Sequence, residues 1–507
     1  MILWSRDVTI FGEKQTITIT PLVLLVLFAI VLRIPTLFEP YWYGDEAIYL
    51  TLGEGIRQGL LLYRDLFDHK PPLIYLLASL SGSLFWFKFA LLLSSVLSIV
   101  LFWKLAGWIF ENKFRPIFFS SIVFTLLTTL PTLEGNIANS ELFMLAPTLG
   151  AFVLLSDPKR ISVKRTFLAG LLFSISFLYK VPGVFDLLAI IAFWMFSIKS
   201  VKSFQRIVFY TLILFSGVFT PVLVSVVYFG SQGALAQYLD AAGFININYI
   251  SRWGSGDSGG GLVLGSGFFL RTVVFAGALG VLYLFKRFFT LASLFVSIWF
   301  LFTLFSALLS GRPYPHYLIQ VVPPFALLVA FLGFGKVRER LLPIPFFLLL
   351  SVTVLYYKFS YYPTYPYYAN FLSFATGQKT KDEYFKAFNS RVPRIYALSS
   401  LLSQRTDPGD PVFIWGTAPE IYALSRRVPP IPYVTSFHIG DFEKGEEVML
   451  KISSNKPKYI LIMPEEQRSL PGFQTFLMQN YIYIENVDGV EVWKLLNPDI
   501  AQYLRRQ

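Results

Sequence analysis

Long apolar segments recur through the first 357 residues of this chain, and they constrain its fold more than any other feature. A helix needs about 20 predominantly apolar residues to cross a hydrocarbon layer roughly 30 Å thick. We therefore predict an all-α polytopic membrane bundle of about eleven transmembrane helices in this region. The segments lie near residues 20–38, 86–109, 117–133, 142–156, 166–180, 183–198, 207–229, 268–285, 288–309, 317–335 and 341–357.

The overall composition agrees with a membrane protein. The chain is 55% hydrophobic and only 15% charged, whereas soluble domains carry about 25% charged residues. The net charge of +12 could suggest a nucleic-acid partner, but most basic residues lie in short connections between apolar segments. Membrane topology explains that placement, so we expect membrane lipids and no nucleic acid as partners. The chain has no cysteine, which excludes disulfides and thiolate metal sites.

The basic residues also predict the orientation of the chain. Alternate connections are rich in Lys and Arg, as expected for cytoplasmic loops; they include Lys113 and Arg115, residues 159–165 and 199–206, Lys286 and Arg287, and residues 336–340. This pattern places the N-terminus in the cytoplasm and the C-terminal region outside a plasma or inner membrane. A signal peptide is the alternative for the first segment, but no small-residue cleavage site follows it. We expect a retained helix whose Arg33 reaches the membrane interface.

The C-terminal region, residues 358–507, differs in character from residues 1–357, and we predict it as a separate extracytoplasmic α/β domain. A polar segment at 376–394 favours a helix, and short apolar runs at 411–415, 459–463, 481–484 and 490–493 favour strands. Asp488-Gly489 between the last two runs is typical of a tight hairpin. His438, Asp441 and Glu443 form a loose group that we expect on the surface of this domain.

The first external connection, residues 39–72, carries the most informative polar residues. Asp45 and Glu46 are adjacent carboxylates just beyond a helix end, where they are costly unless hydrated, paired or metal-bound. A carboxylate there could remove a proton from a hydroxyl, and Lys70 could hold a phosphate. The alternative is a solvated loop of mixed charge, and composition alone does not decide between them.

These residues resemble a known family. The stretches 41–49 and 63–72, which end in Asp68-His69-Lys70-Pro71-Pro72, are similar to the first loop of GT-C glycosyltransferases. They resemble most the bacterial and archaeal relatives of protein O-mannosyltransferases and of the lipid A aminoarabinose transferase. Weaker matches to the same proteins occur at 134–141, 177–183, 311–317 and 416–422.

The resemblance implies an enzyme that transfers a sugar from a polyprenyl-phosphate donor to a hydroxyl of a protein, glycolipid or cell-envelope glycan, with inversion. It implies Asp45 as general base, and Glu46 as an orienting residue or, with Asp45, as ligand of a divalent ion such as Mg, Mn or Zn. The implied donor-phosphate cations are Lys70, Arg312 and Lys180. The remaining residues implied in substrate binding are Tyr49, Tyr63, Asp68, His69, Glu141, Trp253, His316 and Tyr317.

Several of these residues have a simpler interpretation. Lys180 lies at a helix end and could extend its ammonium to the interface. His69 and His316 could bond loop backbone rather than a metal, and Glu141 could be a solvated acid at a helix start. The glycine-rich stretch 252–261 could order over a lipid-linked substrate as a lid or be an inert linker.

Two other function classes remain in view. A secondary transporter or flippase would place polar residues at mid-membrane and often shows an internal repeat. A scaffold would use the C-terminal domain for assembly alone. The acids and histidines of this chain concentrate in the external connections, which favours chemistry at the membrane surface over a transport path.

Overall fold

The computed structural model describes residues 7–10, 13–16, 19–157, 160–246 and 267–497, and the chain divides into two compact units. The first unit contains residues 1–36, 89–225 and 247–364, and the second contains 37–88, 226–246 and 365–507. The second unit therefore combines the C-terminal region with two segments from the apolar part of the chain. The sequence did not predict this exchange, and the division at residues 357 and 358 stays a prediction.

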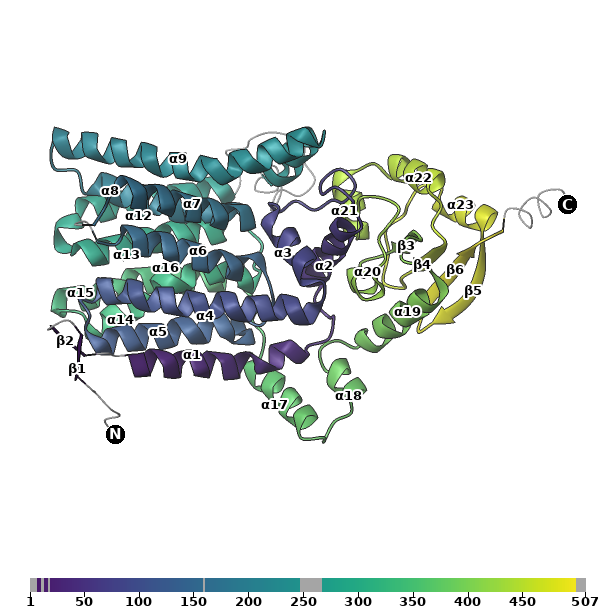
Figure 1. The fold of residues 1–507 in the computed structure, drawn as a ribbon, viewed down its shortest axis with the longest axis horizontal. Helices are drawn as coiled ribbons and strands as arrows, with labels where there is room; N and C mark the ends of the chain where they lie inside the picture. The colour runs from purple at the N-terminus through teal and green to yellow at the C-terminus, as the bar shows by residue number, and fades with distance from the viewer. Residues whose placement is uncertain (1–6, 11–12, 17–18, 158–159, 247–266, 498–507) are drawn as a thin grey trace. The chain divides into compact units, whose positions relative to one another are not determined.

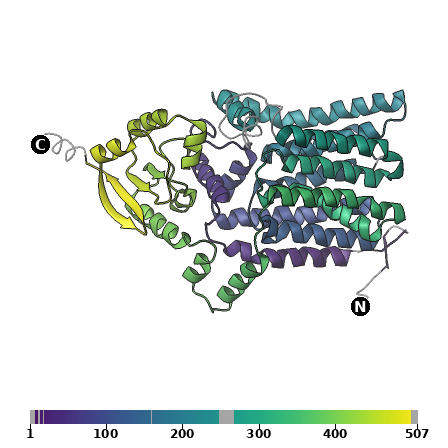
Figure 2. The same ribbon diagram turned by 180° about the vertical axis from the view of Figure 1, so that it is seen from behind.

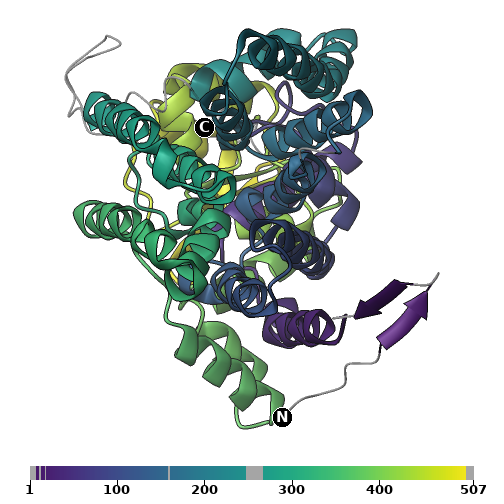
Figure 3. The same cartoon turned by 90° about the vertical axis from the view of Figure 1, so that its left-hand side faces the viewer.

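The first unit is a bundle of helices that run side by side (Figure 1) and are seen nearly end-on in Figure 3. The helices α12 to α16, teal to green, are seen from the other side in Figure 2. A short antiparallel pair, β1 (Asp7–Ile10) and β2 (Glu13–Thr16), precedes the bundle. Its main helices are α1 (Ile19–Arg33), most of α4 (Leu84–Ile109), α5 (Phe114–Thr129), α6 (Ser140–Leu155), α7 (Val163–Tyr179), α8 (Val184–Phe196), most of α9 (Val201–Ser231), α12 (Gly267–Leu284), α13 (Leu291–Ala307), α14 (Val322–Phe334), α15 (Val337–Leu341) and α16 (Pro343–Tyr357).

Each apolar segment predicted from the sequence overlaps one of these helices, because a helix satisfies the backbone hydrogen bonds of an apolar run within the segment itself. Among the described residues, five helical stretches are long and apolar enough to cross a membrane. Five shorter helices are also apolar, and the predicted number of eleven spans stays a prediction. The long stretches are Pro21–Phe38, Leu84–Ile109, Val201–Ser231, Pro315–Phe334 and Glu339–Tyr357.

Close packing holds the bundle together while its outer surface remains apolar. Gly170 of α7 and Gly217 of α9 face each other, and a Cβ on either would collide with the backbone of the other helix. Small residues allow membrane helices to approach closely in this way. On α9, Leu223 and Val224 are exposed, which suits a surface that contacts lipid rather than water.

Arg33 at the end of α1 does not reach outward, so the expectation of an interfacial side chain is wrong. Its side chain is only 1% exposed, and its guanidinium donates to the backbone oxygens of Gly135 and Thr128 at 2.9 and 2.8 Å. A guanidinium has five donors. The carbonyl of Thr128, in the last turn of α5, and that of Gly135, after the helix, accept from two of them. Arg33 therefore fixes the connection before α6.

The second unit contains a four-stranded sheet with the order β3-β4-β6-β5. Its strands are labelled in Figure 1, where β5 and β6 are yellow. Strands β3 (Val412–Trp415) and β4 (Tyr459–Ile462) are parallel, and β4 pairs antiparallel with β6 (Val490–Leu495), which pairs with β5 (Tyr481–Val487). The predicted strands and hairpin are confirmed. Asp488 and Gly489 both have positive φ, 47° and 88°, as a tight turn of this kind requires.

Helices complete the second unit, and α19 and α23 pack against β5. The predicted helix at 376–394 is only partly correct, because the polypeptide forms two helices there, α18 and α19. The helices of this unit are α2 (Gly44–Arg57), α3 (Leu73–Ser81), α10 (Leu235–Leu239), α17 (Thr364–Ala375), α18 (Lys381–Lys386), α19 (Val392–Arg405), α20 (Pro419–Ser425), α21 (Ser436–Phe442), α22 (Gly445–Ser454) and α23 (Phe473–Asn480). Helix α2, inside the predicted polar connection, packs on α3 and α20.

Candidate functional site

Asp45 lies in the first turn of α2, where the unsatisfied backbone N–H groups of a helix N-terminus favour a negative charge. Its Oδ2 accepts a hydrogen bond of 3.2 Å from the hydroxyl of Tyr49, one turn later on the same helix. The Nζ of Lys70 is 3.5 Å from the same oxygen, yet the Asp45 side chain remains 36% exposed. Asp45 is thus held in place by two neighbours and still accessible to solvent.

Lys70 is positioned by two buried tyrosines. The hydroxyl of Tyr63 donates to the backbone oxygen of Lys70 at 2.8 Å, and the backbone N–H of Lys70 donates to the hydroxyl of Tyr75 at 3.2 Å. Burial raises the pKa of Tyr63 and of Tyr75 well above the usual value, so both keep their protons. The ammonium of Lys70 also lies 5.0 Å from the ring centroid of Tyr49, a favourable cation–π distance.

A buried acid and two histidines lie beside Lys70. The Oδ1 of Asp68 accepts from the backbone N–H of His69 at 2.8 Å and is 2.9 Å from its Nδ1. The Nε2 of His438, on α21, is 3.8 Å from the same oxygen. His438 is buried, so its predicted surface position is wrong; its ring packs against those of Phe67 and Phe442, each with a centroid distance of 5.8 Å.

The charge states within this group follow from burial and from its neighbours. Burial raises the pKa of the Asp68 carboxyl, but the charges of Lys70 and His69 and the hydrogen bond from His69 outweigh it, so the pKa lies well below its usual range. Burial lowers the pKa of His438 to about 4, although the Asp68 charge opposes that shift. At neutral pH the group therefore presents an anionic carboxylate and a neutral imidazole.

Asp68, His69 and His438 are also a candidate metal group, because one ligand atom from each lies within 4.8 Å of the others. The Oδ2 of Asp68 and the Nδ1 of His438 are buried and lack a hydrogen-bond partner. Buried polar atoms normally have a partner, and imidazole nitrogens with one carboxylate are a donor set typical of zinc. The group differs from the predicted pair Asp45 and Glu46, whose role as metal ligands stays a prediction.

Glu46 has different surroundings from Asp45 although the two are adjacent. Its carboxylate is buried and lies 2.6 Å from the Nζ of Lys88, which also donates to Glu39 at 3.0 Å. The hydroxyl of Tyr367 donates to Glu39 at 2.6 Å. Sequence reasoning missed Lys88, although a single lysine at the start of the apolar segment 84–109 is a signal that it has an acidic partner.

A second polar cluster lies within the first unit, where α6, the end of α7 and the 3-10 helix Pro315–Val321 meet. Lys180 donates to Glu141, and its ammonium lies 4.4 Å from the ring centroid of Tyr317. The Nδ1 of His316 contacts the carboxylate of Glu134, and its Nε2 is 3.6 Å from Glu141. The expected hydrogen bonds from His316 to loop backbone are replaced by bonds to acids.

The predicted site residues therefore fall into two groups. Asp45, Tyr49, Tyr63, Asp68, His69 and Lys70 gather in the second unit, and Glu141, Lys180, His316 and Tyr317 gather in the first. Arg312 is half-buried between α13 and the 3-10 helix Pro315–Val321, and its backbone N–H donates to the hydroxyl of Ser310 at 3.3 Å. Trp253 and the glycine-rich stretch 252–261 lie outside the described residues.

No protein-family model matches the chain, and no curated protein matches it. The crystal structure of ArnT from Cupriavidus metallidurans bound to undecaprenyl phosphate is similar to this chain with a TM-score of 0.53 at 14% identity, covering 95% of this chain and 99% of that chain. The apo state of that protein gives a TM-score of 0.54 at 13% identity, covering 93% and 97%. The chain thus has the fold of ArnT, an aminoarabinose transferase of the GT-C class, and the GT-C resemblance seen in its sequence is confirmed at the level of the fold.

Proposed function

We propose that this protein is an integral membrane glycosyltransferase that moves a sugar from a polyprenyl-phosphate carrier to an acceptor hydroxyl on the extracytoplasmic face. The observation that carries the proposal is the partly exposed carboxylate of Asp45 with the ammonium of Lys70 at 3.5 Å. A base for the acceptor and a cation for the phosphate thereby lie side by side. The fold supports the same class, because the similar ArnT structure binds undecaprenyl phosphate.

In this mechanism the Asp45 carboxylate removes the proton from the acceptor hydroxyl as that oxygen attacks the anomeric carbon of the sugar. A new carbon–oxygen bond forms while the bond from the anomeric carbon to the phosphate oxygen breaks, with inversion of configuration. The bonding electrons leave with the lipid phosphate, which is a stable anion, so a strong general acid is not needed. The proton remains on Asp45 until solvent removes it.

Cations near the departing phosphate would stabilise the charge that develops there. Lys70 is the strongest candidate, because it is held by Tyr63 and Tyr75 and lies beside the base. Lys180, which is paired with Glu141 in the first unit, is a second candidate. Arg312 stays a candidate on the resemblance of its sequence motif.

Two tyrosines predicted to bind substrate have a positioning role in this proposal. Tyr49 and Tyr63 are buried, and their hydroxyls bond to Asp45 and to the backbone of Lys70. Glu46, buried with Lys88, would likewise fix the first turn of α2 rather than contact the acceptor. Substrate specificity would then rest on residues with more exposed side chains.

A divalent ion is compatible with this proposal at Asp68, His69 and His438. The three residues fit such an ion because one ligand atom from each lies within 4.8 Å of the others, although the Nζ of Lys70 lies only 3.7 Å from Oδ2 of Asp68. When bound, zinc or a similar ion would add positive charge near the donor phosphate. The residues themselves keep Lys70 oriented whether or not the ion is present.

A secondary transporter remains the second candidate because of one buried acid in the bundle. Asp186 in the first turn of α8 accepts hydrogen bonds from the indole of Trp299 at 2.6 Å and from the amide of Gln320 at 2.8 Å. Buried acids at membrane depth often mark transport paths. The two hydrogen bonds also suit a structural role, in which Asp186 ties α8 to α13 and to the 3-10 helix Pro315–Val321.

Purified protein in liposomes with labelled polyprenyl-phosphate sugars and an acceptor membrane extract would test the proposal. We expect label to pass from the lipid carrier to a new product, with free polyprenyl phosphate released in equal amount. Movement of intact donor across the bilayer without release of polyprenyl phosphate would instead support the transporter. A parallel reaction with a chelator would show whether a metal contributes.

A further inference from the structure

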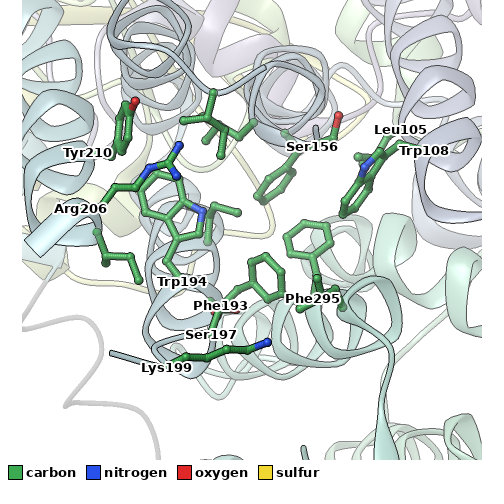
Figure 4. Close-up of a pocket in the computed structure, with 16 residues that line it drawn as sticks. Leu105, Trp108, Ser156, Phe193, Trp194, Ser197, Lys199, Arg206, Tyr210 and Phe295 are labelled. Carbon is green, nitrogen blue, oxygen red and sulfur yellow. The ribbon is translucent and has the colours of Figure 1, made fainter. Parts of the chain in front are cut away.

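The first unit contains an apolar cavity of about 370 Å³, shown in Figure 4. Its wall is formed by the ends of α4, α6 and α8 and the beginnings of α9 and α13, with side chains that include Trp108, Phe152, Trp194 and Phe295. Ligand pockets typically measure about 300–1,000 Å³ and are lined mainly by apolar and aromatic side chains. The cavity therefore has the size and lining for part of a hydrocarbon chain.

Basic side chains also line this cavity. Lys199 and Arg206 line the cavity together with Tyr210, and the guanidinium of Arg206 lies 5.6 Å from the ring centroid of Tyr210. Lys199 and Arg206 are both exposed, and the segment 199–206 contains a third cation but no acid.

The cavity lies at the opposite end of the bundle from the cluster around Glu141. Glu141 is in the first turn of α6 and Leu155, which lines the cavity, is its last residue; at 1.5 Å per residue they are roughly 21 Å apart along the helix. The connections at the cavity end are those in which Lys and Arg predict a cytoplasmic position. The cytoplasmic leaflet carries anionic lipids that attract such basic segments.

We propose that this cavity binds one acyl chain of an anionic glycerophospholipid of the cytoplasmic leaflet, with the lipid phosphate held by Lys199 and Arg206. The apolar wall accommodates the chain, and the two cations select a negative headgroup. The bound lipid would bridge α9 to α4, α6, α8 and α13, so it would stabilise the first unit. This proposal is independent of the reaction assigned to Asp45.

Native mass spectrometry on the purified full-length protein, titrated with phosphatidylglycerol or phosphatidylcholine, would test the lipid site. The test variant carries Lys199→Gln and Arg206→Gln, and the matched control is Lys202→Gln, which removes a charge from the same segment outside the cavity. We expect saturable binding of phosphatidylglycerol to wild type and to Lys202→Gln. Binding to the double variant should be weaker by roughly tenfold or more, since each basic residue contributes about 1 kcal/mol near an anionic lipid.

A cavity-filling variant, Ser197→Phe, separates the cavity from surface attraction. This variant keeps every charge but fills the cavity with a phenyl ring. We therefore expect it to lose saturable binding of phosphatidylglycerol. Its thermal unfolding midpoint without lipid should stay near that of wild type. If Ser197→Phe does not fold, the double variant and its control decide alone. Three outcomes would overturn the proposal. The first is that phosphatidylglycerol binding weakens equally in the double variant and in Lys202→Gln, and the second is that wild type binds both lipids equally. The third is that the cavity binds polyprenyl phosphate in place of phosphatidylglycerol.

Discussion

The ammonium of Lys70 lies between two carboxylates, 3.5 Å from Oδ2 of Asp45 and 3.7 Å from Oδ2 of Asp68. The first carboxylate is accessible, and the second is buried with a pKa well below its usual range. Since Asp68 stays ionised, it balances the charge of Lys70 in the absence of substrate. An arriving phosphate would contact a cation that is already held in position.

Replacing Lys70 by glutamine should lower sugar transfer by about 100-fold, because one charge-stabilising group at a developing anion contributes on that order. Lys70→Arg should retain more activity than Lys70→Gln, since it keeps the charge. Initial rates of transfer in liposomes measure the effect. Arg64→Gln, in the same connection and paired with Asp65, is the control; transfer by Lys70→Gln within twofold of this control would remove Lys70 from the phosphate site.

Lys88→Met should destabilise the second unit strongly. It would leave Glu39 and Glu46 buried without their shared cation, and breaking a buried ion pair costs about 3–5 kcal/mol. Thermal unfolding in detergent would measure the change. Lys104→Met on the same helix, where the side chain is exposed, should leave the midpoint near that of wild type, and similar midpoints for both variants would contradict the role of Lys88.

Glu420 in α20 should make the stability of the C-terminal sheet region depend on pH. Burial raises its pKa, with its own backbone N–H and Arg391 opposing, and its Oε2 has no hydrogen-bond partner. The folded state therefore binds a proton more tightly than the unfolded state, so this contribution to stability is full below the unfolded pKa and is lost as pH rises through the folded pKa.

Glu420→Gln should consequently raise the unfolding midpoint at pH 7.5 and reduce the fall of that midpoint as pH rises from acidic values. We expect the free energy of unfolding at pH 7.5 to increase by about 1 kcal/mol. Glu446→Gln on α22, whose side chain is exposed, serves as control. A lower midpoint for Glu420→Gln than for the control at pH 7.5 would mean that the charged carboxylate is stabilising.

Zinc binding should depend on the buried histidine of α21. We expect His438→Ala or Asp68→Asn to reduce the zinc retained per protein, measured by elemental analysis after dialysis, and to abolish any rise of the unfolding midpoint on addition of zinc. Asp441→Asn, exposed on the same helix, should behave as wild type. Zinc contents that are equal in all four proteins would exclude this group as the metal site.

Hydropathy was sufficient for much of the fold. The apolar segments overlap the helices because a local run of apolar residues, such as the one that contains Leu223 and Val224, is enough to predict a membrane helix. No knowledge of its tertiary contacts is needed. The hairpin at Asp488-Gly489 follows from local turn chemistry. Helix α2 was harder, because Gly53 and Gly55 interrupt it and glycine disfavours helices in isolation; packing on α3 and α20 compensates for that preference.

The candidate site was only partly visible in the sequence. The motif from Asp45 to Lys70 is local and could be recognised, but the pairing of Asp68 with His438 joins residues far apart in the chain. One sequence does not contain that information, so His438 was expected on the surface. Lys88 and Arg33 were assigned to the membrane interface or passed over, because the carboxylates and carbonyls that satisfy them come from other segments.

Sugar transfer by wild type and by Asp45→Asn tests the central claim most directly. Both proteins would be assayed with polyprenyl-phosphate sugars and membrane extract, with Asp65→Asn from the same connection as control and with folding checked by thermal unfolding. The account predicts transfer by wild type and by Asp65→Asn, and a loss of at least about 100-fold in Asp45→Asn, consistent with removal of a general base. Equal transfer by wild type and folded Asp45→Asn would contradict it.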